Sequence, residues 1–332
     1  MSRATFVAVG DMTTDAFIRL FSDKAEVVDG EDPKLCMGYA DKIPFEKAYI
    51  IPAVGNSANA AVSASRLGLP SALVAHVGDD VQGREMIERL KKEGVDARFV
   101  TVNNDKPSNY HYVLWYKDDR TILIKQEDFV YHVPKLLEEP RWMYFSSVGE
   151  HSLEFHHELA EYVRKHISVN FVFQPGTFQL KISPQEIQDL YHATKLFFCN
   201  REEAQIVLKT HEYEIEPLAK GIRALGPEIV VITDGPKGAY TYEGNKLWFM
   251  PPYPDPKPPF ERTGAGDAFS STYTAALALG LSIEDAMRWG PVNSMSVVQY
   301  VGAQEGLLTR PQLEEFLAHA HADYKPKLLK EF

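Results

Sequence analysis

The sequence predicts an α/β protein with a mostly parallel central sheet, flanked by helices in three layers, and a small β lid. Short continuous apolar runs alternate with amphipathic helical patterns, which is typical of parallel strands joined by crossover helices. Polar turns rich in Gly, Asp and Asn follow the apolar runs. The 332 residues, 45% of them hydrophobic, are enough for one large core, so we expect a single domain over residues 1–332.

The elements follow one another in a regular order along the chain. Apolar runs predict strands at Phe6–Val9, Leu73–Val77, Met143–Phe145, Phe171–Phe173, Leu196–Phe198 and Ile229–Thr233. The patterns between them predict helices at Asn59–Leu67, Gln82–Lys92, Leu153–His166, Arg201–Leu208 and Ile215–Ala224. Another apolar helical pattern starts after Gly264 and ends at Gly280.

Three segments interrupt this order. Residues 16–52 are polar and contain scattered prolines, and residues 109–125 resemble a hairpin around Lys117–Asp119. These two segments together predict the small β lid over the main domain. Residues 251–259 contain six prolines, which predicts an extended connector into the Gly-rich turn at 264–266.

Composition and charge exclude several classes of protein. A formal net charge of -11 argues against a nucleic-acid binder, which needs a basic face, but it does not argue against nucleotide binding. Cys36 and Cys199 lie far apart in the sequence and cannot form a zinc site by themselves. The chain begins directly with a strand, and no apolar run is long enough to span a membrane. We therefore expect a cytoplasmic protein with no membrane or nucleic-acid partner.

Several polar turns are expected to meet at one edge of the sheet, because ligands of open α/β sheets bind beyond the carboxyl ends of the strands. These turns are Gly10–Asp15, Gly78–Asp80, Gly149–Glu150, Asn200–Glu203 and Thr233–Gly238. Each turn alone is also compatible with an ordinary helix cap, and for Asn-x-x-Glu the cap is the more frequent explanation. Their convergence at one edge favours a ligand site.

The segment Glu261–Phe269 is the most informative one. A Gly-rich turn that enters a helix leaves backbone N–H groups unpaired, and the helix dipole there favours negative charge. A carboxylate at the edge of such a phosphate site, here Asp267, is suited to accept a proton from an attacking hydroxyl. The structural alternative is a Gly-rich turn with Asp as a helix cap.

Other motifs can supply the rest of a nucleotide and hydroxyl site. Asn200 and Glu203 offer oxygen ligands for Mg²⁺, and the glycines of Thr233–Gly238 allow close approach of a nucleotide. Asn59 and Asp15 can bind vicinal hydroxyls, although the small residues of 57–64 are explained by close helix packing alone. The sequence contains neither a Walker phosphate loop nor Gly-x-Gly-x-x-Gly after the first strand.

With these motifs in order, the chain resembles the ribokinase (PfkB) family of carbohydrate and nucleoside kinases from about Val7 to Thr309. The family's first signature resembles Gly55–Gly68, and its second resembles Thr263–Phe269. Its Asn-x-x-Glu motif is present as Asn200–Glu203.

The resemblance implies a role for each matching position. Asp267 matches the catalytic base, and Gly264, Ala265 and Gly266 match the anion hole for the transferring phosphoryl group. The positions that match sugar-hydroxyl contacts are Asp15, Gly55, Asn59 and Glu150. The positions that match the nucleotide and Mg²⁺ region are Asn200, Glu203, Thr233, Gly235, Gly238 and Asn293. A monovalent-cation site, typically for K⁺, would match Glu261, Thr263, Val297 and Gly302.

The resemblance also implies ATP as the phosphoryl donor and, in many relatives, a homodimer through the lid. This sequence departs from the family at several positions. Val54 replaces a glycine, Asn56 replaces a frequent lysine, and Gln174-Pro175-Gly176 replaces a start with Asp or Asn. Glu261-Arg262 replaces the common Asp-Thr, which leaves K⁺ activation open.

Three functions are therefore compared. The leading one is a kinase for a small sugar or sugar acid. The second is a nucleoside kinase, since the aromatic residues Tyr110, Tyr112, Trp115 and Tyr116 of the lid can stack on a base. Packing between two lids explains the same residues and is favoured over base stacking. The third is an inactive binding or scaffold protein on a kinase fold, against which Asp267, Asn200 and Glu203 argue.

Overall fold

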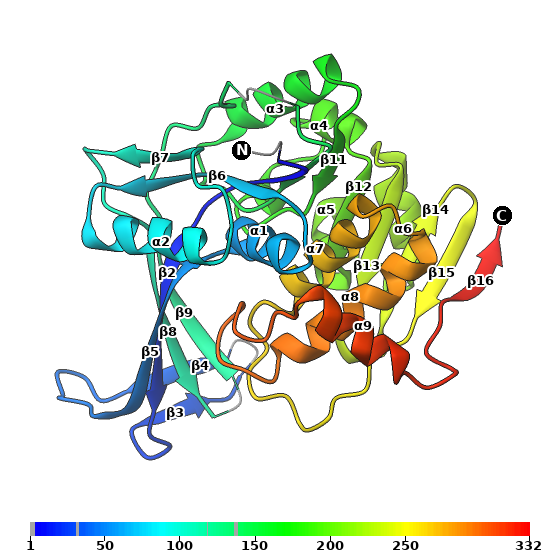
Figure 1. Ribbon diagram of the computed structural model, residues 1–332. Coiled ribbons are helices and arrows are strands. Elements are labelled where there is room, and N and C mark those ends of the chain that lie inside the picture. Colours follow the sequence, from blue (N-terminus) through cyan, green and yellow to red (C-terminus); the bar gives the residue numbers. More distant parts are fainter. Residues whose placement is uncertain (1–3, 31–32, 118, 136–138) are drawn as a thin grey trace.

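The computed structural model describes residues 4–30, 33–117, 119–135 and 139–332 (Figure 1). Its strands form a large sheet, a small four-stranded sheet and a two-stranded hairpin. In the described residues, no helix is both long and apolar enough to cross a membrane.

The large sheet is parallel except at one edge. Its parallel strands are β1 (Phe6–Val9), β6 (Ser71–Gly78), β7 (Val100–Asn103), β10 (Trp142–Phe145), β11 (Asn170–Phe173), β12 (Leu196–Asn200) and β13 (Ile229–Thr233). The antiparallel strands are β14 (Ala239–Glu243), β15 (Lys246–Met250) and β16 (Lys327–Glu331). The order is β16-β15-β14-β13-β12-β11-β10-β1-β6-β7. The chain reverses its direction of travel across the sheet between β1 and β10, where open α/β sheets bind ligands.

Two hydrophobic cores lie on the two faces of this sheet. Alternate side chains of one strand belong to different cores: Phe6 and Ala8 to the first, Val7 and Val9 to the second. The first core packs against helices α1 (Asn56–Arg66), α2 (Val81–Lys92), α7 (Ala265–Ala278), α8 (Ile283–Val297) and α9 (Arg310–Ala318). The second packs against α3 (Leu153–Lys165), α4 (Gln188–Ala193), α5 (Arg201–Leu208) and α6 (Ile215–Ala224). The three-layer arrangement follows directly from strands that are apolar on both faces.

The segments predicted to form the lid contain most of the small sheet, which extends from the body at the lower left of Figure 1. Its strands are β2 (Thr13–Leu20), β5 (Phe45–Val54), β8 (Tyr110–Tyr116) and β9 (Asp119–Lys125), in the order β5-β2-β8-β9. The hairpin pairs β3 (Ala25–Val28) with β4 (Lys34–Met37). The predicted hairpin turn includes Asp118, which lies outside the described residues.

All six predicted strands and all five predicted helices are present, with some shifted boundaries. Helix α1 starts at Asn56 instead of Asn59, because Gly55 has a φ of 108° and turns the chain directly from β5 into the helix. The Pro-rich connector between β15 and α7 contains no helix or strand, and 3₁₀ turns lie at Gln179–Lys181 and Gly235–Lys237.

Candidate active site

Asp267 lies in the first turn of α7, beside the glycines with which the helix begins. Gly264 precedes the helix with a φ of 79°, a conformation that favours glycine. A Cβ at this position would lie 2.3 Å from the Cβ of Ala303, so the turn has no space for a side chain. Unpaired N–H groups and the helix dipole give such a turn positive potential. The turn therefore places a carboxyl group at the positive end of a helix.

Three side-chain amides donate hydrogen bonds to the Asp267 carboxyl group, which is buried. Asn56 Nδ2 lies 2.9 Å from Oδ1, and Asn59 Nδ2 lies 2.8 Å from Oδ2. Gln174 Nε2 lies 3.1 Å from Oδ1. Burial raises the pKa of Asp267, and the three amide donors act in the opposite direction.

Gln174 follows β11 and connects Asp267 to two buried hydroxyl groups. Its Oε1 accepts hydrogen bonds from Tyr144 Oη and from Ser270 Oγ, the second at 2.6 Å. The sequence marks Gln174 and Asn56 only as departures from the family pattern and predicts neither contact. They lie 93 and 211 residues from Asp267, so no local signal connects them to it.

Asp15 in β2 and His111 in β8 are paired residues on neighbouring strands of the small sheet. Asp15 Oδ1 lies 3.3 Å from His111 Nδ1. Asp15 Oδ1 and His111 Nε2 are buried and lack a hydrogen-bond partner of good geometry, so both can bind a ligand. Gly55 has a φ of 108°, and a Cβ there would lie 3.0 Å from the carbonyl oxygen of Asp11.

Glu150, the remaining predicted acceptor residue, has an exposed side chain. The buried carboxyl group in this region is that of Asp11, to which the sequence assigned no role. It accepts hydrogen bonds from Tyr131 Oη, at 2.9 Å, and from Gln126 Nε2. Burial raises the pKa of Asp11 to about 7, although these hydrogen bonds lower it.

Asn200 and Glu203 form a capping box at the start of α5. Asn200 Oδ1 accepts from Glu203 N, and Glu203 Oε2 accepts from Asn200 N, each at 2.8 Å. Burial raises the pKa of Glu203, the bond from Asn200 N lowers it, and the charge of Asp267 raises it further. In the described part of the chain, no three His, Cys, Asp or Glu side chains are grouped to hold a metal ion.

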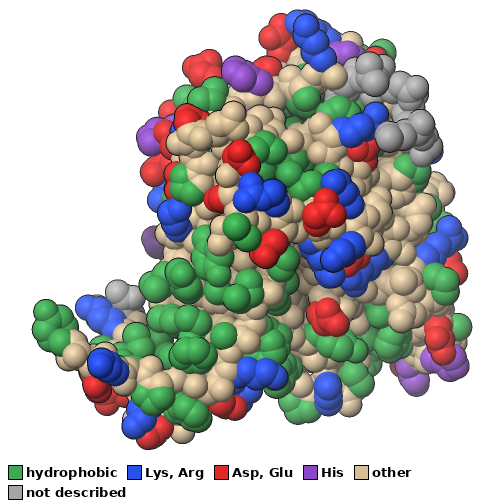
Figure 2. All heavy atoms as spheres, turned by 60° about the vertical axis from the view of Figure 1, so that its left-hand side comes forward, with side chains coloured by type: hydrophobic (Ala, Val, Ile, Leu, Met, Phe, Trp, Pro, Cys, Tyr) green, Lys and Arg blue, Asp and Glu red, His purple; other side chains and the backbone are tan. Residues whose placement is uncertain are grey.

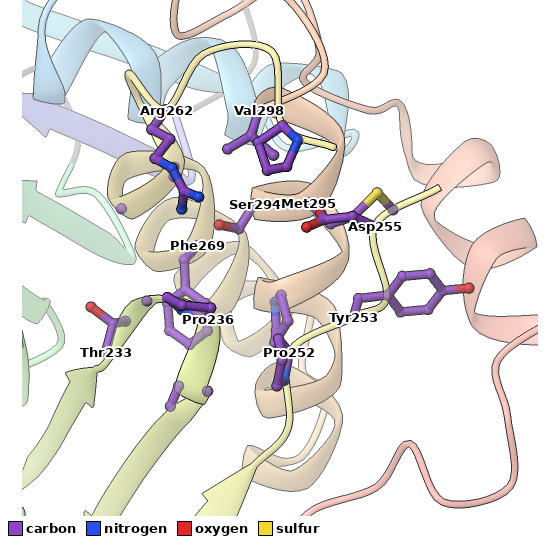
Figure 3. A pocket seen from close by; sticks show the side chains of 17 residues that line it. Thr233, Pro236, Pro252, Tyr253, Asp255, Arg262, Phe269, Ser294, Met295 and Val298 are labelled. Atoms are coloured by element: carbon purple, nitrogen blue, oxygen red, sulfur yellow. The ribbon is translucent and has the colours of Figure 1, made fainter. Parts of the chain in front are cut away.

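A cavity of about 240 Å³ lies between the turn after β13, the connector and helices α7 and α8 (Figure 3). Several predicted nucleotide and anion-hole residues line it: Thr233, Gly235, Gly238, Ala265 and Gly266. Arg262 also lines the cavity, which places a positively charged side chain there. The sequence marked Arg262 only as a departure and gave it no role in binding.

Asn293 is placed differently from the other predicted nucleotide residues. It is fully buried in α8, its Nδ2 donates to Thr272 Oγ1 at 2.7 Å, and its Oδ1 accepts from Leu308 N at 2.9 Å. It does not line the cavity, whereas the next two residues, Ser294 and Met295, do. The helical period explains this difference, because consecutive residues of a helix point to different sides.

The predicted cation residues Glu261, Thr263 and Gly302 lie together. Glu261 is buried, with Oε1 at 2.6 Å from Thr263 N and Oε2 at 3.3 Å from Gly302 N. The Thr263 hydroxyl is buried without a partner, and the Val297 carbonyl oxygen accepts from Tyr300 N. A residue that the sequence did not indicate, Arg120 of β9, places its Nε 3.7 Å from Glu261 Oε1.

The aromatic side chains of the small sheet do not surround the acceptor groups. Strand alternation places Tyr110 and Tyr112 on the face opposite Asp15 and His111. Trp115 is buried against Phe260 at a ring distance of 5.1 Å. A separate contact fixes Tyr116, whose hydroxyl donates to the carbonyl oxygens of Ser22 and Ala25.

The arrangement thus combines a cavity, a Gly-rich turn at the start of a helix and a buried carboxyl group beside that turn. A family model for pfkB family carbohydrate kinases matches residues 52–310. The chain belongs to the pfkB family. It is a carbohydrate kinase of the ribokinase family, whose members act on sugars or nucleosides, and the predicted resemblance is confirmed.

Relatives of this PfkB kinase support the family and its fold. The ribokinase of Bacillus subtilis (strain 168) is 29% identical over 273 residues, which are 80% of this chain and 87% of that protein. The structure of Arabidopsis thaliana ribokinase complexed with ribose and ATP has a TM-score of 0.79 and 18% identity, covering 96% of this chain and 100% of that one. The nucleoside kinase of Methanocaldococcus jannaschii has a TM-score of 0.74 and 19% identity, covering 94% and 97%. The fold is ribokinase-like, as the sequence predicts.

Proposed function

We propose that this PfkB kinase transfers the γ-phosphoryl group of ATP to a hydroxyl group of a small sugar, with Asp267 as general base. The single observation that carries the proposal is the position of the Asp267 carboxyl group, buried at the edge of the anion site and held by three uncharged amides. Catalysis then rests on positioning and on stabilising the charge of the transferring group. The N–H groups at Gly264, Ala265 and Gly266 supply that stabilisation.

The nucleotide is assigned to the cavity beside this turn. Thr233, Gly235 and Gly238 border the cavity with little side-chain bulk, which suits close approach of phosphates and ribose. Arg262 adds a positive charge that favours a polyphosphate. The base is assigned to the part of the cavity near Met295, because Asn293 is committed to contacts inside the core.

Mg²⁺ fits Glu203 and the bound phosphates better than a cage made of protein alone. Mg²⁺ commonly keeps several waters and takes one or two carboxylates together with substrate phosphates. The charge of Asp267 raises the pKa of Glu203, which supports a position of this carboxyl group near the reacting groups. Asn200 then acts mainly by fixing Glu203 through the capping box. The ion would neutralise phosphate charge when it is bound.

A monovalent cation fits its predicted residues only in part. The orphaned Thr263 hydroxyl and the buried Glu261 carboxyl group are suitable ligands. The guanidinium group of Arg120, however, already places positive charge beside Glu261. We therefore infer that K⁺ is not required for activity.

The acceptor is assigned to the space between Asp267 and the small sheet, which we propose acts as a lid that excludes water. Asp15 and His111 carry unsatisfied polar atoms, and one amide hydrogen of Asn59 remains free for a hydroxyl oxygen. Gly55 contributes by letting the start of α1 approach the backbone of Asp11, whereas Glu150 would have to move from its exposed position to contribute. Carboxyl groups and amides favour a neutral polyhydroxyl compound over a sugar acid.

A nucleoside is the second candidate acceptor, because members of this family include nucleoside kinases. The placement of Tyr110 and Tyr112 on the face opposite Asp15, and the packing of Trp115 against Phe260, disfavour base stacking by the lid. An inactive scaffold is the third candidate. It is disfavoured because a protein without catalytic activity does not need a buried carboxyl group held by three amides. Homodimerisation through the lid and a cytoplasmic location stay predictions.

The proposal is tested by ADP release from MgATP with purified protein. The acceptor panel contains ribose, fructose, 2-keto-3-deoxygluconate, adenosine, cytidine, guanosine and inosine. We expect acceptor-dependent turnover with one of the neutral sugars. Turnover with a nucleoside alone would reassign the acceptor site, and nucleotide binding without turnover on any compound would favour the scaffold.

A further inference from the structure

The hydrogen bonds to Asp267 are distributed unequally between its two carboxylate oxygens. Oδ1 accepts two, from Asn56 Nδ2 at 2.9 Å and Gln174 Nε2 at 3.1 Å. Oδ2 accepts one, from Asn59 Nδ2 at 2.8 Å. A carboxylate offers about two acceptor sites on each oxygen. Oδ1 is therefore saturated, and one acceptor site remains on Oδ2.

The orientation of the Gln174 amide is fixed by its other contacts. Gln174 Oε1 accepts from Tyr144 Oη and Ser270 Oγ, and because an ionised carboxylate only accepts hydrogen bonds, the nitrogen end faces Asp267. A flipped amide would point its oxygen at the carboxylate and its nitrogen at two hydroxyl groups. A flip would therefore lose the hydrogen bond to Asp267 and set two oxygens against each other, although both hydroxyl groups could accept from the nitrogen.

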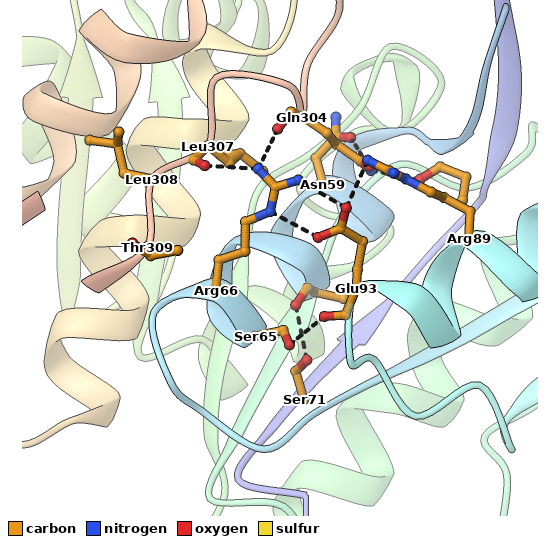
Figure 4. A network of polar contacts seen from close by, with 12 residues as sticks. Asn59, Ser65, Arg66, Ser71, Arg89, Glu93, Gln304, Leu307, Leu308 and Thr309 are labelled. Carbon is orange, nitrogen blue, oxygen red and sulfur yellow. Dashed lines mark hydrogen bonds and ion pairs between the residues drawn. The ribbon is translucent and has the colours of Figure 1, made fainter. Parts of the chain in front are cut away.

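Asn59 is oriented in the same way, by a network that Figure 4 shows. Gln304 Nε2 donates to Asn59 Oδ1 at 3.1 Å and to the carbonyl oxygen of Ala53 at 2.6 Å. The carbonyl oxygen of Gln304 accepts from the Arg66 guanidinium group at 2.8 Å, and the same group binds Glu93 through two hydrogen bonds. Helix α1, the end of α2 and the loop before α9 therefore hold the second amide in place.

The charged and titratable groups around Asp267 do not replace the amides. From β10, the Tyr144 hydroxyl has a pKa well above its usual value because it is buried, so it stays neutral. From α5, Glu203 is an acid, and its charge opposes that of Asp267. In the described residues, Asp267 forms no ion pair with Lys, Arg or His. The amide donors are thus what favours the ionised form.

We propose that Gln174 is a positioning residue which, together with Asn56, occupies Oδ1 of Asp267 and leaves Oδ2 as the atom that accepts the proton. This proposal rests on the proposed function of Asp267 as general base. The acceptor oxygen forms the new bond to the γ-phosphorus, and the bond from that phosphorus to the bridging oxygen breaks. ADP leaves with this electron pair, and the acceptor proton is transferred to Oδ2.

The test measures the titration of Asp267 directly, without any acceptor. Protein labelled with ¹³C at the Asp side-chain carboxyl is titrated by NMR, and Asp267→Asn identifies the signal. Gln174→Met removes the amide donor while keeping a side chain of similar size, so we expect the titration midpoint of Asp267 to rise by about one pH unit in this variant. Gln174→Glu keeps an acceptor oxygen for Tyr144 and Ser270 but adds a like charge, so its midpoint should rise further.

Gln179→Met is the matched control. Gln179 is a buried glutamine of the same connection, bound to Gly176 N and the Ser146 carbonyl oxygen, without a contact to Asp267. We expect its Asp267 midpoint to equal that of the wild type. An unchanged Asp267 titration midpoint in folded Gln174 variants would overturn the proposal. If Gln174→Met does not fold, the midpoint of Gln174→Glu alone decides.

A second readout separates this proposal from the proposed function. With MgATP and D-ribose, the acid limb of the kcat/KM profile should move to higher pH in Gln174→Met, because a base works only when ionised. The KM for ATP should not change. Absence of turnover by the wild type across the whole panel would remove the proposed function, whereas the NMR midpoint would still decide how Asp267 is held.

Discussion

At Asp267, two opposing effects act on one carboxyl group. Burial disfavours its ionised form, and hydrogen bonds from Asn56, Asn59 and Gln174 favour it. A lysine in place of one amide would hold the carboxylate equally well but would also neutralise it. Neutral donors keep the negative charge that a base needs. The departures from the family pattern at positions 56 and 174 thus have the same physical explanation: each supplies an uncharged amide donor to Asp267.

The sequence alone predicts some of the residues of this candidate site. Asp267, Gly264 and Gly266 were predicted because a Gly-rich turn before an apolar helix is visible in a short stretch of sequence. The contacts of Gln174 were not, because they depend on how β11 and α7 meet in space. The core position of Asn293 was not predicted either, since it depends on the rotation of α8.

The two glycines of the anion site should respond differently to alanine. In Gly264→Ala, the new Cβ would meet Ala303 and the φ of 79° would be strained, so we expect a loss of about 1–3 kcal/mol of stability. In Gly266→Ala, the Cβ would enter open space, so the Tm should stay close to that of the wild type. Its methyl group would instead occupy space assigned to phosphate and lower kcat/KM for ATP by about tenfold or more.

Thermal unfolding and ADP release, measured on the same preparations, distinguish the two variants. A Gly264→Ala protein as stable as the wild type would contradict the packing argument. A Gly266→Ala protein with full activity would contradict the assignment of the phosphate site.

At the scale of elements, local sequence signals predict whether a segment is a helix or a strand better than they predict where it begins and ends. Helices α5 and α6 and strand β13 have the predicted boundaries, and at α5 the capping box coincides with the start of the apolar pattern. The Asn200–Glu203 motif shows how one pattern serves two purposes, since the capping box that begins α5 also fixes the proposed Mg²⁺ carboxyl group. Strands β14–β16 escaped prediction because short antiparallel strands at an edge carry a weaker apolar signal.

The contact between β9 and the connector predicts how the enzyme responds to salt. The Arg120 guanidinium group lies beside the buried Glu261 carboxyl group, so replacing KCl with choline chloride should not change wild-type turnover. Arg120→Met leaves that carboxyl group without its cation, and K⁺ should then raise turnover severalfold.

The control is Arg98→Met, which removes an exposed arginine paired with Asp96. It should show no response to K⁺. Strong K⁺ dependence of the wild type, or an Arg120→Met enzyme that ignores K⁺, would contradict the inference.

At the scale of the whole molecule, the parallel sheet with two cores was predictable because its strands are apolar on both faces. The small sheet has a different pattern, with several exposed apolar side chains. Register places Ile50, Ala16, Tyr112 and Leu123 in one row across its four strands. Ile50 is 63% exposed, Leu123 52% and Tyr112 47%, and Figure 2 shows hydrophobic side chains gathered over this sheet.

Three exposed apolar side chains in one row, those of Ile50, Tyr112 and Leu123, are typical of an interaction surface. We therefore expect a dimer in sedimentation velocity at micromolar concentration, and Leu123→Lys should shift it to the monomer. Ile167→Lys changes a single, 94% exposed residue outside the small sheet and should leave the dimer intact. A wild-type monomer at these concentrations would contradict the dimer.

The central claim is that Asp267 accepts the proton during phosphoryl transfer. The most direct measurement compares kcat of the wild type and Asp267→Asn with the acceptor that supports turnover, together with ATP affinity by calorimetry. We expect kcat to fall by about three orders of magnitude or more, since the amide cannot take the proton, while the Kd for ATP changes little. An Asp267→Asn enzyme that keeps near wild-type kcat would contradict the claim.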